Sequence, residues 1–170
     1  MDYQQPTDSR LSNLLGLWRE KCGDSGLPDR TCFTPEVLRS WLGSLALIDV
    51  ADGQYRYRLY GSNFVYRFGI EMTGRVVDDL PREQASAVRR DYDTVVRTRQ
   101  PLIRLYTGGF DIIDLNRRIG TKRVETWERL VLPLSCSSRE VDMLLVAAYE
   151  LSAQIMDASG MTSGFGPAPI

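Results

Sequence analysis

The stretch Tyr55–Arg75 reads YRYRLYGSNFVYRFGIEMTGR, and its hydrophobic period changes abruptly. It opens as a two-residue alternation, which predicts a strand with Tyr55, Tyr57 and Leu59 on one face and Arg56, Arg58 and Tyr60 on the other. Gly61 ends the alternation, and Ser62 can cap a short helix that carries Phe64 and Phe68 and ends at Gly69. The stretch therefore predicts a strand that leads directly into a short helix.

A second strand is predicted immediately upstream. Residues Leu45 to Val50 form the apolar run LALIDV, and Asp52-Gly53 separates this run from the alternating segment 54–60. Two apolar segments joined by Asp-Gly predict a β-hairpin with a short loop. Arg56 and Arg58 are expected to guard the edge of this hairpin against unwanted strand pairing. Two alternatives are that Arg58 pairs with a carboxylate and anchors the sheet to the N-terminal segment, and that the arginines bind an anion.

Two flanking helices are predicted before the hairpin, within residues 9–43. In the first, over residues 8–22, four apolar side chains share one face: Leu11, Leu14, Leu15 and Trp18. The second begins at Thr34-Pro35-Glu36, a favourable capping sequence, and ends at Gly43. The first helix is amphipathic and needs a surface to pack on. Residues 1–8 are expected to be flexible.

After the opening stretch, residues 82–98 form the clearest long helix, with an apolar stripe of Ala85, Val88, Tyr92, Val95 and Val96. Three strands are predicted to follow, over residues 101–106, 122–135 and 141–151. Residues 109–121 leave strand and loop both open. The segment from residue 152 is rich in Gly, Ser and Pro and predicts a flexible tail. The core is expected to span residues 44–151 in an α+β arrangement.

The composition excludes several classes of site. The chain of 170 residues has no histidine, which removes histidine-based nucleophile activation, histidine-ligated haem and most zinc sites. Its three cysteines include no C-x-x-C motif, so neither a disulfide framework nor a zinc ribbon is indicated. The polar N-terminus does not resemble a secretory signal, and no apolar run is long enough to cross a membrane. A cytoplasmic protein without a bound metal is expected.

Charge gives little support for nucleic-acid binding. The formal net charge is −1, and Asp91 and Asp93 interrupt the basic face of helix 82–98. A nucleic-acid surface would need a continuous basic face with stacking aromatic side chains. A solvated helix face is the preferred interpretation.

The order of elements, with the motifs LALIDV, YRYRLYGSNF, GIEMTGR (69–75) and ERLVLPLS (128–135), resembles a PAS domain. More narrowly, it resembles a small bacterial family of stand-alone PAS-type proteins, over roughly residues 9–151. The resemblance implies a five-stranded antiparallel sheet in the order 2-1-5-4-3, with the helical insert on one face. It also implies a sensory or protein-interaction role in signal transduction.

PAS domains hold cofactors, metabolites or merely side chains between the sheet and the helices, so the resemblance suggests a ligand-binding set. This set comprises Tyr57, Leu59, Phe64, Phe68, Tyr92, Val95, Leu130 and Leu145. The alternative is that these side chains form an ordinary core. Many PAS domains also form dimers through an N-terminal helix, and here Leu11, Leu14, Leu15 and Trp18 would form the homodimer interface.

The departures from the family pattern bear on the expected cofactor and on the expected route of the signal. The insert has no cysteine for a flavin adduct, and the chain has no histidine for haem, so no cofactor is predicted. About twenty residues follow the last predicted strand, too few for an output domain, so output is expected to pass through a partner or through self-association. The ligand would be a small apolar or amphipathic molecule. A small α+β enzyme that uses Asp and Tyr as acid and base is the alternative from another class.

Overall fold

The computed structural model describes residues 5–23, 26–111, 122–136, 140–156 and 162–163. In chain order, the helices, 3-10 turns and strands are α1 (Ser9–Cys22), η2 (Arg30–Cys32), η3 (Leu42–Ser44), β1 (Leu45–Ala51), β2 (Gln54–Tyr60), α2 (Ser62–Phe68), η4 (Val77–Asp79), α3 (Arg82–Thr98), β3 (Leu102–Asp111), β4 (Lys122–Leu134), β5 (Met143–Met156) and β6 (Thr162–Ser163). Helix α3 has the bounds that its apolar stripe predicts. No helix in the described ranges combines the length and apolar character that crossing a membrane requires.

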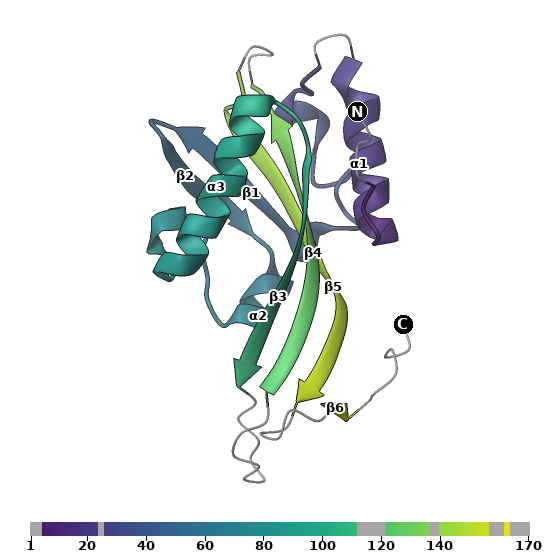
Figure 1. Ribbon diagram of the computed structural model, residues 1–170. Coiled ribbons are helices and arrows are strands. Elements are labelled where there is room, and N and C mark those ends of the chain that lie inside the picture. Colours follow the sequence, from purple (N-terminus) through teal and green to yellow (C-terminus); the bar gives the residue numbers. More distant parts are fainter. Residues whose placement is uncertain (1–4, 24–25, 112–121, 137–139, 157–161, 164–170) are drawn as a thin grey trace.

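The sheet has the order β2-β1-β5-β4-β3, and every pair of neighbouring strands is antiparallel. This confirms the predicted fold. Helices α2 and α3 lie over one face of the sheet and α1 over the other (Figure 1). The short strand β6 adds a pairing with the end of β5, at a position where the sequence predicted a flexible tail. Strand β3 continues to Asp111, so residues 109–111 of the segment 109–121, for which strand and loop were both open, belong to a strand. Residues 112–121 lie outside the described part of the chain.

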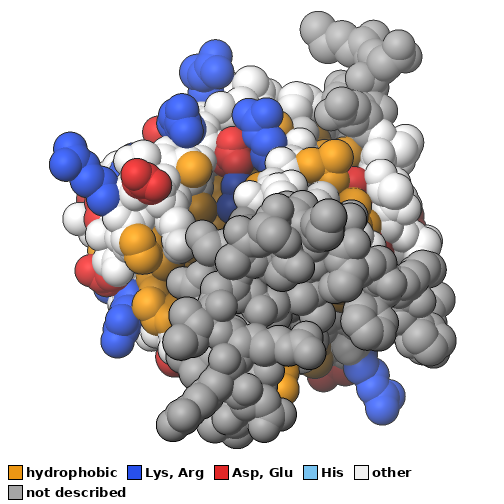
Figure 2. Space-filling view, turned by 60° about the horizontal axis from the view of Figure 1, so that its bottom comes forward, with side chains coloured by type: hydrophobic (Ala, Val, Ile, Leu, Met, Phe, Trp, Pro, Cys, Tyr) orange, Lys and Arg blue, Asp and Glu red, His pale blue; other side chains and the backbone are white. Residues whose placement is uncertain are grey.

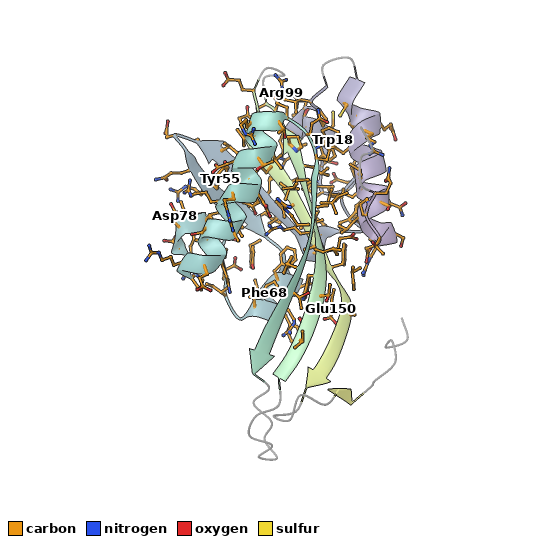
Figure 3. The ribbon with its side chains drawn as sticks, viewed as in Figure 1. Trp18, Tyr55, Phe68, Asp78, Arg99 and Glu150 are labelled. Atoms are coloured by element: carbon orange, nitrogen blue, oxygen red, sulfur yellow. The ribbon has the colours of Figure 1, made fainter. Side chains whose placement is uncertain are left out.

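Because both faces of the sheet are covered, the protein has two apolar layers. We call the first the α3-side layer; it lies under α2 and α3 and includes Tyr57, Phe64, Tyr92, Val95 and Trp127. We call the second the α1-side layer; it lies under α1 and includes Leu11, Leu14, Leu130, Leu132 and Leu145. Figure 3 shows Tyr55 and Phe68 on the α3 side of the sheet and Trp18 on the α1 side.

A β-bulge in strand β2 changes the predicted facing of its last residues. Tyr57 pairs with Ile48, but Leu59 pairs with Leu47, so β2 contains one more residue than β1 over this step. The extra residue moves Leu59 away from the face of Tyr57 and leaves it 39% exposed. Tyr60 takes the inward position instead, with its ring 5.4 Å from that of Tyr57. The prediction that Leu59 shares a face with Tyr55 and Tyr57 was therefore wrong.

The junction between β2 and α2 depends on Gly61. A Cβ atom at this position would lie 2.3 Å from the carbonyl oxygen of Gly43 and 2.9 Å from that of Leu45. Both atoms belong to the backbone, so they cannot move aside as the end of a side chain could. We predict that Gly61→Ala lowers the free energy of unfolding by about 2 kcal/mol or more. Urea denaturation followed by circular dichroism measures this change.

Gly16 provides the matched control. It lies within α1, and a Cβ atom there would meet nothing within 4 Å. Gly16→Ala should therefore stabilise the protein by roughly 0.5–1 kcal/mol, as a helix-interior glycine replaced by alanine normally does. Equal effects of the two substitutions would contradict the close approach at Gly61.

The second predicted flanking helix is absent as a regular helix. Residues 35–41 form consecutive turns, followed by the 3-10 turn η3. Leu38 N–H donates to Thr34 O, whereas Trp41 N–H donates to Leu38 O and Ser44 N–H to Trp41 O, which are three-residue steps. The capping sequence therefore starts one helical turn, but the i→i−4 pattern does not continue. Within residues 9–43, the described α-helix is α1 alone.

Helix α1 is held against the sheet of its own chain. Leu11, Leu14, Leu15 and Trp18 are all buried in the α1-side layer, and the Trp18 indole Nε1–H donates to Pro133 O at 2.8 Å. These four side chains were predicted to form a homodimer interface. The structure corrects that prediction, because the face that they form already packs against β4 and β5 and is not accessible to a second copy.

The residues just before α1 are anchored by a buried glutamate. Both carboxylate oxygens of Glu128, on β4, accept backbone hydrogen bonds: Oε1 from Thr7 N–H at 2.8 Å and Oε2 from Asp8 N–H at 2.7 Å. Asp8 in turn caps α1 by accepting from Arg10 N–H. Residues 7 and 8, which the sequence placed in a flexible N-terminus, are therefore fixed to the centre of the sheet.

Candidate functional site

The strand–helix junction brings a series of aromatic rings together under α2. Helix α2 ends at Gly69, which adopts the left-handed conformation, and this short helix directs Phe64 and Phe68 toward the sheet. Successive ring centroids from Tyr57 through Tyr60, Phe64 and Phe68 to Trp127 lie 5.3–6.3 Å apart. Rings at these separations form favourable tilted and edge-on contacts. The α3-side layer is therefore aromatic along its whole length beneath α2.

A buried ion pair fixes α2 to the sheet. Glu125 on β4 is fully buried, and its Oε2 accepts from Arg67 Nε–H at 2.8 Å and from Trp127 Nε1–H at 2.8 Å. The Arg67 Nη2 group also donates to Oε1 of the same carboxylate. This two-point contact sets the position of α2 on the sheet, because a planar guanidinium fits a carboxylate in one orientation.

A second charged cluster lies where α3 crosses β3 and β4. Asp91 of α3 accepts from Arg104 Nε–H at 3.0 Å and from an Nη2 hydrogen of Arg129. The Arg129 side chain is 14% exposed, and its buried Nε–H has no hydrogen-bond partner among the described residues. A buried donor without a partner costs roughly 1–3 kcal/mol. This N–H is therefore an available donor inside the protein.

Tyrosines surround this cluster. Tyr57 is hydrogen-bonded to Tyr92, and the ring of Tyr106 lies 5.6 Å from the Arg129 guanidinium carbon. Burial raises the pKa of Tyr57 and Tyr92 well above the ordinary value, and it raises that of Tyr106 to about 12, although the Arg129 charge acts in the opposite direction at all three. The phenols are consequently neutral donors around neutral pH.

These shifts predict a loss of stability in alkaline solution. The folded pKa of each of these tyrosines exceeds the ordinary value of about 10, so above about pH 10 the unfolded chain releases protons that the folded chain retains. The free energy of unfolding should therefore be unaffected by these groups below about pH 9 and fall steadily from about pH 10. Urea unfolding across this range measures the fall, and tyrosinate absorbance should show the buried phenols ionising together with unfolding. Complete ionisation of all eight tyrosines in the folded protein would contradict the burial.

The structure separates the predicted ligand-binding residues into three groups. Tyr57, Phe64, Phe68, Tyr92 and Val95 lie together in the α3-side layer. Leu130 and Leu145 lie in the α1-side layer, on the opposite face of the sheet, and Leu59 is exposed because of the bulge. These three leucines cannot line a site beneath α2 and α3, so their placement in one set was wrong.

The sequence prediction missed the charged and aromatic residues of β4. Glu125, Trp127 and Arg129 occupy alternate positions and face α2 and α3, while Leu130 and Leu132 face α1. The segment ETWERLVL (125–132) contains this alternation, with Glu125, Trp127, Arg129 and Val131 on one face of the strand and Thr126, Glu128, Leu130 and Leu132 on the other.

The surface beside α3 also has a shallow hollow of about 250 Å³. It is lined by Asp78, Leu80, Arg82, Ala85, Ser86 and Arg89. Arg89 spans this region by donating to Asp78 Oδ2 at 2.6 Å and to Gly53 O at 3.0 Å. The hollow therefore lies beside an ion pair that connects the hairpin turn to η4 and α3.

The described residues contain no candidate metal centre, and the face in Figure 2 carries charges of both signs. Within the described ranges, no three Cys, Asp or Glu side chains come together in a way that could hold a metal ion. On the uncovered part of the face in Figure 2, basic side chains stand apart and acidic ones lie between them. This surface has the mixed charge of a solvated face.

Comparison with known proteins addresses the family. No significant match was found among curated proteins. Among solved structures, the sensory box sensor histidine kinase from Vibrio cholerae has 17% sequence identity and a TM-score of 0.47, and the match covers 69% of this chain and 88% of that chain. The family model described as "PAS domain" matches residues 7–147, from the anchored segment before α1 to the middle of β5. A match of this extent shows that the chain belongs to the PAS domain family, whose members are generally sensory modules rather than catalysts.

Proposed function

We propose that this PAS domain is a sensory module that binds a small amphipathic molecule between the sheet and helices α2 and α3. The observation that carries the proposal is the chemical difference between the two faces of the sheet. Nine of the fourteen buried residues of the α1-side layer are leucine, although Trp18 and Tyr149 also belong to it, whereas the α3-side layer contains three buried tyrosines (Tyr55, Tyr57 and Tyr92) and two arginine–carboxylate ion pairs. Binding sites for small molecules combine apolar and aromatic lining with a few polar groups in this way.

Buried polar groups in the α3-side layer cost stability compared with an apolar core of the same volume. Burying a hydroxyl or a charge costs free energy unless it gains partners, and leucine on the other face fills the same kind of space without this cost. A module that must recognise a ligand needs such groups, because they fix its orientation. The aromatic rings of Phe64, Phe68 and Trp127 would contact the apolar part of the ligand.

In this proposal the ligand is held without a covalent bond, and neither haem nor a flavin–cysteine adduct is involved. The chain has no histidine. Cys22 and Cys32 pack against the α1-side layer, and Cys136 is exposed. Burial raises the pKa of the Cys22 thiol to about 11, which keeps it in the unreactive neutral form.

We also propose that the signal passes to a protein partner or to a second copy of the chain, in the cytoplasm. The buried face of α1 is not available for this contact, so a homodimer would use another surface. Small-angle scattering or light scattering of the purified chain would give its mass in solution. A monomer at all concentrations would leave a different protein as the recipient of the signal.

Native mass spectrometry of protein purified without denaturation tests the ligand. We expect a mass above that of the chain in the native spectrum and the mass of the chain alone after denaturation. Tyr92→Phe, which removes a hydroxyl from the α3-side layer, should reduce the occupied fraction. Leu59→Ser, at the exposed position beside the bulge, is the matched control and should leave the occupied fraction unchanged.

Repeated native preparations with the mass of the chain alone would count against ligand binding.

The enzyme alternative gains no support from the arrangement of the carboxylates. Glu125 is ion-paired with Arg67, and Asp91 with Arg104 and Arg129, so neither is placed as an uncommitted acid or base. We therefore do not propose a catalytic role.

A further inference from the structure

We infer that the ligand carries a single carboxylate and that this group binds the Nε–H of Arg129, with its apolar body under α2. This inference rests on the proposed function and deepens it by naming the class of ligand. It is argued from three side chains of this chain, Asp91, Arg104 and Arg129.

The first step is the balance of charge among Asp91, Arg104 and Arg129. Two guanidinium groups, of Arg104 and Arg129, share the one carboxylate of Asp91, so the three side chains together carry one positive charge. Arg104 is 52% exposed and can be solvated by water. Arg129 is 14% exposed and shares the carboxylate of Asp91 with Arg104, so its charge is only partly balanced within the protein. A monoanion would complete the neutralisation of this buried cation, whereas a dianion would overcompensate it.

The second step is the geometry of the unused donor. Asp91 accepts from Nη2 of Arg129, which leaves the Nε–H without a partner although it is buried. Guanidinium N–H groups form their strongest hydrogen bonds with the oxygens of carboxylates and phosphates. An oxygen of a ligand carboxylate would satisfy the Nε–H and remove the cost of leaving it unpaired.

The third step concerns the surroundings of Arg129. Tyr57, Tyr92 and Tyr106 all lie close enough to feel its charge, and the Tyr106 ring is 5.6 Å from the guanidinium carbon. Neutral phenols donate hydrogen bonds to anions, so they add to the recognition of a carboxylate. Toward α2, the neighbouring side chains are the packed rings of Phe64, Phe68 and Trp127, which would contact an apolar or aromatic body if they move apart to admit it.

A matched pair of probes tests the inference. Phenylacetate and its neutral amide, phenylacetamide, have almost the same shape and differ in charge. We expect phenylacetate to raise the melting temperature of the protein and to bind at least about tenfold more tightly than the amide, because a charged acceptor forms the stronger bond with the guanidinium. Isothermal titration calorimetry and thermal unfolding give the two readouts.

Two variants identify the residue responsible. Arg129→Lys keeps the positive charge beside Asp91 but removes the guanidinium Nε–H and its planar geometry. The preference for phenylacetate over the amide should therefore be lost. Urea denaturation of this variant checks that it is still folded. Arg104→Gln removes the exposed partner of Asp91 but keeps the Nε–H of Arg129, so a preference for the acid should remain, although weakened by the loss of one positive charge from the cluster. Preference for the acid that persists in Arg129→Lys would overturn the assignment to Arg129.

Other outcomes distinguish the inference from the proposed function. Equal stabilisation by the acid and the amide would support a ligand site and overturn the requirement for a carboxylate. The identity of a molecule carried by the natively purified protein also tests whether the ligand must carry a carboxylate. A carboxylate supports the inference. A neutral or cationic compound overturns it while the proposed function stands. Failure of both probes, together with a native mass equal to that of the chain, would contradict both.

Discussion

Leu14→Glu is expected to destabilise the whole protein rather than to divide a dimer. Leu14 is fully buried between α1 and the sheet, in the α1-side layer. A glutamate there would lose the packing of the leucine and place an unpaired carboxylate in the α1-side layer, which also contains Leu130, Leu132 and Leu145. We expect the free energy of unfolding to fall by on the order of 4 kcal/mol. Urea denaturation measures the loss, and hydrogen exchange should show α1 detaching first.

Asn13→Glu is the matched control for this substitution. Asn13 is the preceding residue of the same helix and is exposed, so the same new charge should change stability by less than about 0.5 kcal/mol. Light scattering of both variants completes the test. A halved mass for Leu14→Glu with unchanged stability would show that this helix face contacts a second copy and would contradict the packing described above.

Arg67→Met is expected to have the second largest effect. The substitution removes both guanidinium hydrogen bonds from the fully buried carboxylate of Glu125 and takes the Arg67 charge away from it. Breaking a buried pair in this way typically costs about 3–5 kcal/mol, and the partial exposure of Arg67 places the expected loss at about 3 kcal/mol. Thermal and urea unfolding give the magnitude. Loss of protection from hydrogen exchange in residues 62–68 would locate the effect in α2.

A second substitution separates the loss of the pair from the loss of packing. Arg67→Met combined with Glu125→Gln removes the buried charge and keeps an oxygen for the Trp127 indole, so most of the stability should return. Arg58→Met breaks an ion pair with Asp49 in which the arginine is largely exposed, and it should cost less than about 1 kcal/mol. A double variant no more stable than Arg67→Met alone would refute the role given to the charge.

Local features explain why much of the fold could be predicted from the sequence. The Asp52-Gly53 turn needs two residues with positive φ, and both have it in the structure, at 51° and 70°. The bounds of α3 follow from a single amphipathic stripe that ends at Thr98. The order of strands came from the resemblance to a family, and the antiparallel pairings confirm it.

The candidate site was only partly predictable because it depends on pairings between distant residues. Whether Leu59 faces inward is decided by a bulge against β1, which the alternation within β2 does not reveal. Helices cover both faces of β4, so the alternation of residues along this strand distinguishes two faces but does not tell which of them lies under α3. The ion pairs join residues 38 positions apart, as in Asp91–Arg129, or 58 positions apart, as in Arg67–Glu125.

Consecutive residues of β4 serve the two faces of the sheet. Glu128 binds the backbone before α1, and Arg129 binds Asp91 of α3 on the other side. Neighbouring side chains of a strand point to opposite faces, so one peptide unit separates the N-terminal anchor from the Arg129 cluster. The resonance of the Arg129 amide in a nuclear magnetic resonance spectrum is therefore close enough to both contacts to respond to a change in either one.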